Sequence, residues 1–347
     1  MNALDREAIA AADPRDMLGA VMEQPDQLED ALWRVDSAKL EPAAAPGGLV
    51  VCGMGGSAIG ADLAASCIGH RAEAPLFSSR DYTLPQHAPA DALYLCSSYS
   101  GNTEETLAAY AEAGKTGARR VAMTTGGELA RLAREDGVPV IAVPGGLQPR
   151  AAVAYMTVGA LEAAALCGAA PSLRSEVEAA AALGRSLLAE WGPDAPDGAE
   201  PKAIARRLAE KVPIVYGAGT TDAAATRWKA QLNENAKVPA FRATLPEAGH
   251  NEICGYERGS AFAQFASVFL CDEGQHERTR RRIDLTAGIA EASGAQALRV
   301  ESRGESLTER VLSLVLCGDL ASVYLAALTG VDPTPVEVIE GFKKDLG

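Results

Sequence analysis

The segment LVVCGMGGS, residues 49–57, joins a short apolar run to a glycine-rich turn. An uninterrupted apolar run of this kind predicts a strand that is buried on both faces, as strands of parallel sheets are. The same order of strand, turn and helical pattern recurs further along the chain, with strands expected at 92–96, 120–123 and 138–143. Strands that alternate with helices predict an α/β fold, in which helices cover both faces of a parallel sheet.

The alternation starts again after residues 192–198, GPDAPDG, whose Pro, Gly and Asp content predicts a linker. A strand expected at 212–216 precedes GAGTT at 217–221, just as the first strand precedes GMGGS at 53–57. This constant offset predicts two α/β domains that are built alike. We expect four segments: N-terminal helices over 1–40, a first domain over 41–191, a second domain over 199–332 and a C-terminal helical tail over 333–347.

Composition narrows the possible partners. The 347 residues include 32 Lys and Arg against 46 Asp and Glu, which gives a net charge of −14. General nucleic-acid binders carry the opposite balance, so no nucleic-acid partner is expected, although a local pocket of donors can still hold an anion.

Compartment and redox state follow from other features of the sequence. No apolar run was found that approaches the roughly 20 residues needed to span a bilayer, and the N-terminal residues match neither a signal nor a transit peptide. We therefore expect a cytoplasmic protein without a membrane partner. The 7 cysteines are odd in number and form no CxxC pair, which favours buried reduced thiols over zinc ligands or disulfides.

The glycine-rich turn at 53–57 has three interpretations. Glycines let backbone N–H groups approach a ligand, and the start of a helix adds free donors that suit a phosphate group. With Ala58 the turn also matches the G-x-G-x-x-A pattern of dinucleotide sites. Against that pattern, Ser57 would crowd a pyrophosphate and no acidic residue clearly ends the following strand. A tight turn without a ligand remains the third interpretation.

A second loop, SSYSGNTEET at 97–106, follows the expected strand at 92–96 and opens a helix. Its hydroxyls and backbone donors converge at a helix N-terminus, where they could hold a phosphate monoester without a metal or a lysine. Helix capping by Asn102 or Thr103 is the alternative. Capping needs one hydroxyl and this loop offers several, so phosphate binding is favoured. Both loops follow neighbouring strand ends, where open α/β sheets bind ligands.

Three segments together carry a family resemblance: GMGGSAIG at 53–60, SSYSGNTEET at 97–106, and NEN with PEAGHNEI at 233–253. They resemble the SIS (sugar isomerase) family, and specifically its bifunctional phosphoglucose/phosphomannose isomerase branch. The resemblance implies two SIS domains plus the helical tail. It further implies a metal-independent, cofactor-free aldose–ketose isomerase that interconverts glucose 6-phosphate and/or mannose 6-phosphate with fructose 6-phosphate through a cis-enediolate. The implied assembly is a homodimer with shared active sites.

The resemblance also assigns residues. The family's substrate-phosphate site falls here on Gly56, Ser57, Ser98, Ser100 and Thr103. Its catalytic residues fall on Glu234, His250, Arg150 and Lys343, and the neighbouring Lys344 leaves the last assignment open by one position.

Glu234 is expected near the end of the helix that begins at 221, where the negative end of the helix dipole raises the pKa of a carboxylate and makes it a better base. The alternative is a surface ion pair with Lys237 or Arg227, which share its helix face. The flanking Asn233 and Asn235 are poor helix formers, and their presence favours an oriented carboxylate over a solvated one.

An imidazole is a natural acid or base for ring opening near neutral pH, which makes His250 a candidate for that role. A plain surface position is one alternative. A metal site with Glu247 and Glu252 is another, but it would need further ligands. Arg150 precedes a long apolar helix, and a guanidinium there opposes the helix dipole unless an anion compensates it. A developing enediolate or a nearby carboxylate would be such an anion.

Two other functions stay open from the sequence. One is a non-catalytic phosphosugar-binding SIS regulator, and the other is an amino-sugar phosphate isomerase. The regulator would keep the hydroxyl loops but could dispense with Glu234, His250 and Arg150, and the presence of all three favours catalysis.

Overall fold

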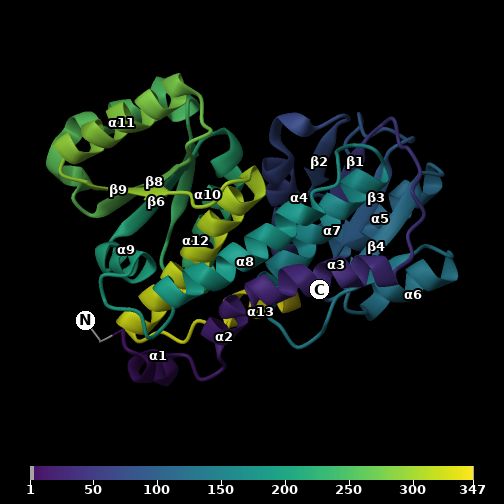
Figure 1. Cartoon of the computed structure of the whole chain (residues 1–347), viewed down its shortest axis with the longest axis horizontal. Helices are drawn as coiled ribbons and strands as arrows, with labels where there is room; N and C mark the ends of the chain where they lie inside the picture. Colours follow the sequence, from purple (N-terminus) through teal and green to yellow (C-terminus); the bar gives the residue numbers. More distant parts are fainter. Residues whose placement is uncertain (1–3, 347) are drawn as a thin grey trace. The chain divides into compact units, whose positions relative to one another are not determined.

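Two parallel β-sheets organise the chain (Figure 1), and the computed structural model describes residues 4–346, apart from the side chains of 260–262. The first sheet has the order β2-β1-β3-β4-β5 and the second the order β7-β6-β8-β9. The strands of the first sheet are β1 (Leu49–Cys52), β2 (Leu76–Ser79), β3 (Leu93–Ser97), β4 (Arg119–Thr124) and β5 (Val140–Ala142). Those of the second are β6 (Val212–Gly217), β7 (Phe241–Thr244), β8 (Phe265–Cys271) and β9 (Gln296–Glu301). The predicted α/β class with two parallel sheets is confirmed.

Helices cover both faces of the first sheet. The strand side chains of one face, among them Tyr94 and Cys96, form a buried cluster with Tyr110 of α5 and Leu129 of α6. The opposite face meets α7, where Ser97 donates a hydrogen bond to the sulfur of Met156 over 3.1 Å. The helices and 3-10 turns of this part are α3 (Gln24–Ser37), α4 (Gly55–Ile68), η1 (Gly69–Arg71), α5 (Glu104–Lys115), α6 (Gly127–Glu135), η2 (Pro149–Ala152) and α7 (Val153–Leu166).

A close approach between α4 and α7 depends on a glycine. A Cβ at Gly60 would lie 2.5 Å from the Cβ of Met156, so no larger side chain fits between the two helices. Helix α7 is buried from Val153 to Ala164, which accounts for its apolar sequence. This packing holds the segment just before α7 against the start of α4.

The second sheet is covered in the same way. Tyr216 and Phe269 stack with ring centroids 4.6 Å apart, and they pack with Ile283 and Ala287 of α11. The helices and 3-10 turns around this sheet are α9 (Glu200–Leu208), η3 (Gly219–Thr221), α10 (Asp222–Glu234), η4 (Glu247–His250), η5 (Glu252–Phe262) and α11 (Glu277–Ala292). The remaining helices are α1 (Arg6–Ala12), α2 (Met17–Met22), α8 (Arg174–Trp191), α12 (Leu307–Thr329) and α13 (Glu337–Leu346).

The chain forms two compact units, one around each sheet. The unit of the first sheet comprises 23–185 and 303–312, and the unit of the second sheet comprises 1–22, 186–302 and 313–347. Helices α8 and α12 each contribute to both units. The expectation that no apolar run approaches a membrane-spanning length is wrong for α12, whose 23 residues pass by length and composition, yet 94% of its most apolar window is buried inside the protein. It is a core helix.

Candidate active site

The two loops that were expected to bind phosphate meet at one edge of the first sheet. Strands β1 and β3 are parallel neighbours with Cys52 opposite Cys96, so both loops leave the sheet side by side. The Ser57 hydroxyl accepts a hydrogen bond from the backbone N–H of Tyr99 over 3.2 Å. A Cβ at Gly53 would lie 2.8 Å from the carbonyl oxygen of Ser97, so the sequence needs a glycine there.

The loop between β3 and α5 is held by its own hydroxyl groups. The hydroxyls of Ser98 and Thr103 lie 2.8 Å apart, and Ser98 also accepts from the N–H of Gly101 over 3.1 Å. Gly101 has a φ of 71°, and a Cβ there would lie 1.9 Å from the carbonyl oxygen of Gly126. Ser98 is therefore buried beneath the loop, whereas Ser100 is exposed at its rim.

The capping interpretation of this loop does not hold. Thr103 occupies the N-cap position of α5, but its side chain makes no capping hydrogen bond and is paired with Ser98 instead. The side-chain oxygen of Asn102 accepts from the N–H of Glu128 over 3.0 Å, so it serves the start of α6. The first turn of α5 thus receives no side-chain cap from either residue, which leaves a helix N-terminus that suits an anion.

Arg150 lies beside the glycine-rich turn. It belongs to η2, and a Cβ at Gly56 would lie 2.9 Å from the carbonyl oxygen of Pro149 and 3.3 Å from the Cα of Arg150. The Arg150 side chain is buried, with 3% of its surface exposed. The structure therefore gathers Gly56, Ser57 and Arg150 with the Ser98 loop at one sheet edge, and all of them belong to the unit of the first sheet.

Glu234, His250 and Lys343 belong to the unit of the second sheet. Glu234 is half-buried and is the last residue of α10. Together with Asn233 and Lys237 it lines one side of a pocket of about 660 Å³, whose other side is the segment Pro335–Ile339. A half-buried carboxylate at the wall of a pocket is a suitable position for a proton-transfer group.

The asparagines on either side of Glu234 anchor the end of α10. Asn235 is fully buried and donates to the hydroxyl of Ser322 in α12 over 2.9 Å. Asn233 donates to the carbonyl oxygen of Val238 over 2.8 Å. Both amides therefore fix the backbone that carries Glu234, as the residue types had suggested.

One of the two residues considered as a surface ion-pair partner of Glu234 is buried elsewhere. Arg227 is not on the surface: it forms a bidentate pair with Asp319 of α12 over 3.0 and 2.8 Å, and the two side chains are 2% and 0% exposed. Lys237 donates to the backbone carbonyl oxygens of Glu234 and Pro333. The buried pair was not predicted, although Arg227, Gln231 and Asn235 lie on one face of α10 and their spacing could have indicated a buried polar contact.

His250 ends η4 and is exposed. The two carboxylates considered as fellow metal ligands have other partners, since Glu247 accepts from the amide of Asn251 over 2.9 Å and Glu252 accepts from the hydroxyl of Tyr216. Among residues 4–346, no group of three or more His, Cys, Asp or Glu side chains is arranged to hold a metal ion.

The carboxylate of Glu252 ends a chain of hydroxyl groups under this loop. The Tyr216 and Tyr256 hydroxyls lie 2.7 Å apart, and Tyr256 is 3.0 Å from the hydroxyl of Ser267. Burial raises the pKa of the Tyr216 hydroxyl well above its ordinary range, and the neighbouring Tyr256 and Glu252 raise it further. The Tyr216 hydroxyl therefore stays protonated at neutral pH. This series of hydrogen-bonded hydroxyl groups anchors the loop to the second sheet.

Lys343 and Lys344 lie in the last turn of α13, and both side chains are exposed. Their positions do not distinguish Lys343 from Lys344, so the assignment of the family's lysine to Lys343 stays a prediction.

Comparisons with known proteins identify relatives of this chain. Residues 198–346 match the family described as the bacterial phospho-glucose isomerase C-terminal SIS domain. The chain is 39% identical to the bifunctional phosphoglucose/phosphomannose isomerase of Caldicellulosiruptor bescii over 304 residues, which cover 86% of this chain and 89% of the relative. It is 37% identical to the protein of the same name from Aquifex aeolicus, with 86% and 90% covered.

Solved structures share the fold. The hypothetical protein TT0462 from Thermus thermophilus superposes with a TM-score of 0.72 at 16% identity, covering 98% of this chain and 93% of that one. Tagatose-6-phosphate ketose/aldose isomerase from Escherichia coli superposes with a TM-score of 0.66 at 18% identity, covering 91% and 94%.

Proposed function

Because the chain belongs to the bifunctional phosphoglucose/phosphomannose isomerase family, we propose that it is an aldose–ketose isomerase that interconverts glucose 6-phosphate and mannose 6-phosphate with fructose 6-phosphate. The observation that carries the proposal is the 39% identity to a curated bifunctional isomerase over 86% of the chain. The loop geometry at the first sheet supports it independently, since that geometry favours a phosphate ligand.

The substrate's 6-phosphate binds at the uncapped N-terminus of α5. Backbone N–H groups of that turn point outward and carry the positive end of the helix dipole. The hydroxyls of Ser57, Ser98, Ser100 and Thr103 and the backbone at Gly56 complete the cradle. Its internal hydrogen bonds, such as the 2.8 Å contact between Ser98 and Thr103, hold it in shape before the ligand arrives.

The four proposed catalytic residues carry out ring opening and proton transfer at the sugar carbons. Isomerisation needs one base that moves a proton between C2 and C1, for which we propose Glu234. His250, with Lys343, opens the sugar ring by proton transfer to and from its oxygen. Arg150 stabilises the negative charge of the cis-enediolate, as a fixed donor does for a developing oxyanion. The anchoring of α10 through Asn235 supports the assignment of Glu234, because a base must be held at a fixed place.

We propose that the enzyme is cytoplasmic and acts as a homodimer with shared active sites. Helix α13 supports the dimer: it buries no residue of its own, and its Val338, Phe342 and Leu346 are 87%, 68% and 62% exposed. Apolar side chains this exposed on one helix are typical of a surface that a second subunit covers. The occupant that we assign to this face is a second copy of the chain.

The decisive experiment incubates the purified, EDTA-treated protein with fructose 6-phosphate and separates the aldose 6-phosphates that form. We expect both glucose 6-phosphate and mannose 6-phosphate, with turnover unchanged by EDTA. Glu234→Gln serves as the matched inactive control because it keeps the size of the side chain and removes the base. Formation of neither aldose by the wild-type protein would overturn the proposed function, and a loss of activity that Mg²⁺ or Zn²⁺ restores would overturn metal independence.

A further inference from the structure

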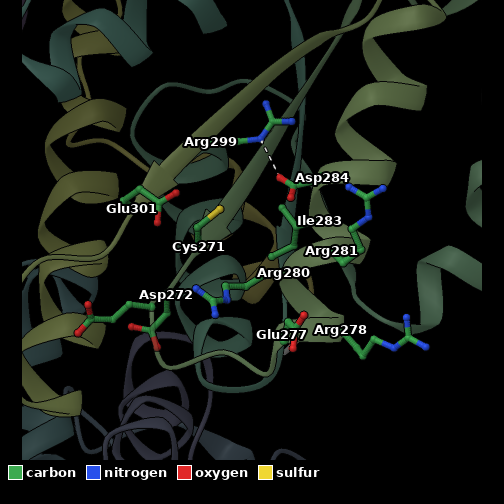
Figure 2. Close-up of a pocket in the computed structure, with 11 residues that line it drawn as sticks. Cys271, Asp272, Glu277, Arg278, Arg280, Arg281, Ile283, Asp284, Arg299 and Glu301 are labelled. Atoms are coloured by element: carbon green, nitrogen blue, oxygen red, sulfur yellow. Dashed lines mark ion pairs between the residues drawn. The ribbon is translucent and has the colours of Figure 1, made fainter.

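A charged pocket opens at the carboxyl ends of β8 and β9 in the second sheet (Figure 2), with a volume of about 640 Å³. The four strands of the second sheet follow the same order as the first four strands of the first sheet, so that β8 and α11 correspond to β3 and α5. The pocket therefore lies at the place in the second sheet that the 98–103 loop occupies in the first. Open α/β sheets bind ligands at this edge, and pockets of about 300–1,000 Å³ accommodate small organic ligands.

One wall of the pocket, here called the cationic wall, carries three arginines, with the carboxylates of Glu277 and Asp284 on the same helix. Arg278, Arg280 and Arg281 line it from the first turns of α11. Within residues 4–346, the side chains of these three arginines take part in no hydrogen bond or ion pair. Three guanidinium groups within four residues repel one another, and they also oppose the positive end of the helix dipole. In a chain with a net charge of −14, such a cluster is conspicuous, and a bound anion would relieve both repulsions.

The opposite wall is acidic and comes from the strand ends. Asp272, Glu273 and Glu301 lie there, and Figure 2 shows Arg280 pointing from α11 toward Asp272. The carboxylate of Asp272 is fixed, since it accepts from the N–H of Gly274 over 3.0 Å and from the hydroxyl of Ser302 over 2.8 Å. Carboxylates accept hydrogen bonds from hydroxyl or ammonium groups. The pocket is thus complementary to a ligand with an anionic end and a body rich in such donors.

The loop between β8 and α11 does not form a second hydroxyl cradle. Gln275 fills the space, because its amide nitrogen donates to the carbonyl oxygen of Ala218 over 3.1 Å and its amide oxygen accepts from the N–H of Asp272 over 3.1 Å. The loop's polar groups are therefore engaged with one another. An anion in this pocket would be held by the arginine side chains of α11.

We propose that this pocket is a second, non-catalytic binding site for a phosphorylated sugar. The phosphate lies against the arginines of α11, and the sugar's hydroxyl or amino groups face the carboxylates of Glu273 and Glu301. Guanidinium–phosphate contacts are charge-assisted and directional, whereas the carboxylates select a polar body over a bare anion. This site is separate from the isomerase site and does not depend on that function.

The test is a calorimetric titration of the full chain with glucosamine 6-phosphate, a probe that carries both a phosphate and an ammonium group. We expect two equivalents per chain for the wild type and one for Arg280→Ala/Arg281→Ala, with the second affinity weakened about tenfold or more through the loss of two charge-assisted contacts. Arg15→Ala/Arg258→Ala removes the same charge from exposed positions outside the pocket and should keep both equivalents.

A second comparison tests the acidic wall. Glu301→Gln should weaken the second glucosamine 6-phosphate equivalent and leave binding of inorganic phosphate unchanged. The absence of any wild-type equivalent that Arg280→Ala/Arg281→Ala removes, or equal losses in both arginine variants, would overturn the proposal. Isomerase activity of the same preparations reports on the first site alone, so an inactive protein that keeps the arginine-dependent equivalent would refute the proposed function and not this one.

Discussion

Removal of the carboxylate of Asp319 should strongly destabilise the unit of the second sheet. Asp319 is 0% exposed and its partner Arg227 is 2% exposed, so Asp319→Ala leaves a guanidinium buried without its two hydrogen bonds of 3.0 and 2.8 Å. Breaking a buried pair by removing one partner costs about 3–5 kcal/mol. An exposed pair would contribute about 0–1 kcal/mol, so the two cases are well separated.

The assay is urea unfolding followed by tryptophan fluorescence. Trp228 adjoins Arg227 in α10, is fully buried and donates to the carbonyl oxygen of Leu314 over 2.7 Å, so it reports directly on the seam between α10 and α12. The matched control is Arg227→Met/Asp319→Leu, which replaces both charges with apolar groups and should recover most of the lost stability. A loss below about 1 kcal/mol in Asp319→Ala would refute the reasoning, since it would mean that the charge left behind finds water.

Three further predictions concern the proposed site and the thiols. Glu234→Gln should lower kcat by about 10²–10⁴-fold, as expected for loss of a general base, and leave the Kd for fructose 6-phosphate nearly unchanged; near-normal turnover would exclude it as the base. Ser98→Ala removes the hydroxyl paired with Thr103 at 2.8 Å and should raise KM about tenfold with a smaller change in kcat, whereas an unchanged KM would contradict the cradle. A thiol reagent at pH 8 should label Cys254, which is exposed, and spare Cys67, whose pKa burial raises to about 12; labelling of Cys67 before unfolding, judged by peptide mapping, would contradict its burial.

The strands that are buried throughout gave the clearest signal in the sequence. All residues of β1 and β3 are buried, which is why their apolar runs were unmistakable. Strand β7 was missed because it lies at the sheet edge, where Phe241 and Arg242 are exposed and no apolar run or alternation marks the strand. Periodicity reports burial, so an exposed edge strand gives no such signal.

Motifs supplied the candidate residues of the site, but spacing alone could not identify the partners of these residues. Asn102 was a candidate cap for the helix that follows it, yet it bonds to Glu128, which lies 26 positions further on. Arg227 shares a helix face with Glu234 and was therefore weighed as its surface partner, whereas it is buried against Asp319, 92 positions away. Helical spacing indicates which side chains share a face, but the element that packs on that face is decided by the tertiary fold.

The two proposed anion sites use one topology in different ways. Each sheet brings a loop and a helix N-terminus to the same edge, after β3 in the first and after β8 in the second. In the first, hydroxyls bond to one another and leave the helix start uncapped, so recognition depends on backbone N–H groups at short range. In the second, Gln275 occupies the loop, and the arginines of the cationic wall lie along the helix beside it. Charges exposed to solvent are screened within about 8 Å at physiological ionic strength, so an arginine wall binds anions more weakly as salt rises. The preformed hydroxyl cradle is better suited to hold a substrate in a fixed position for proton transfer.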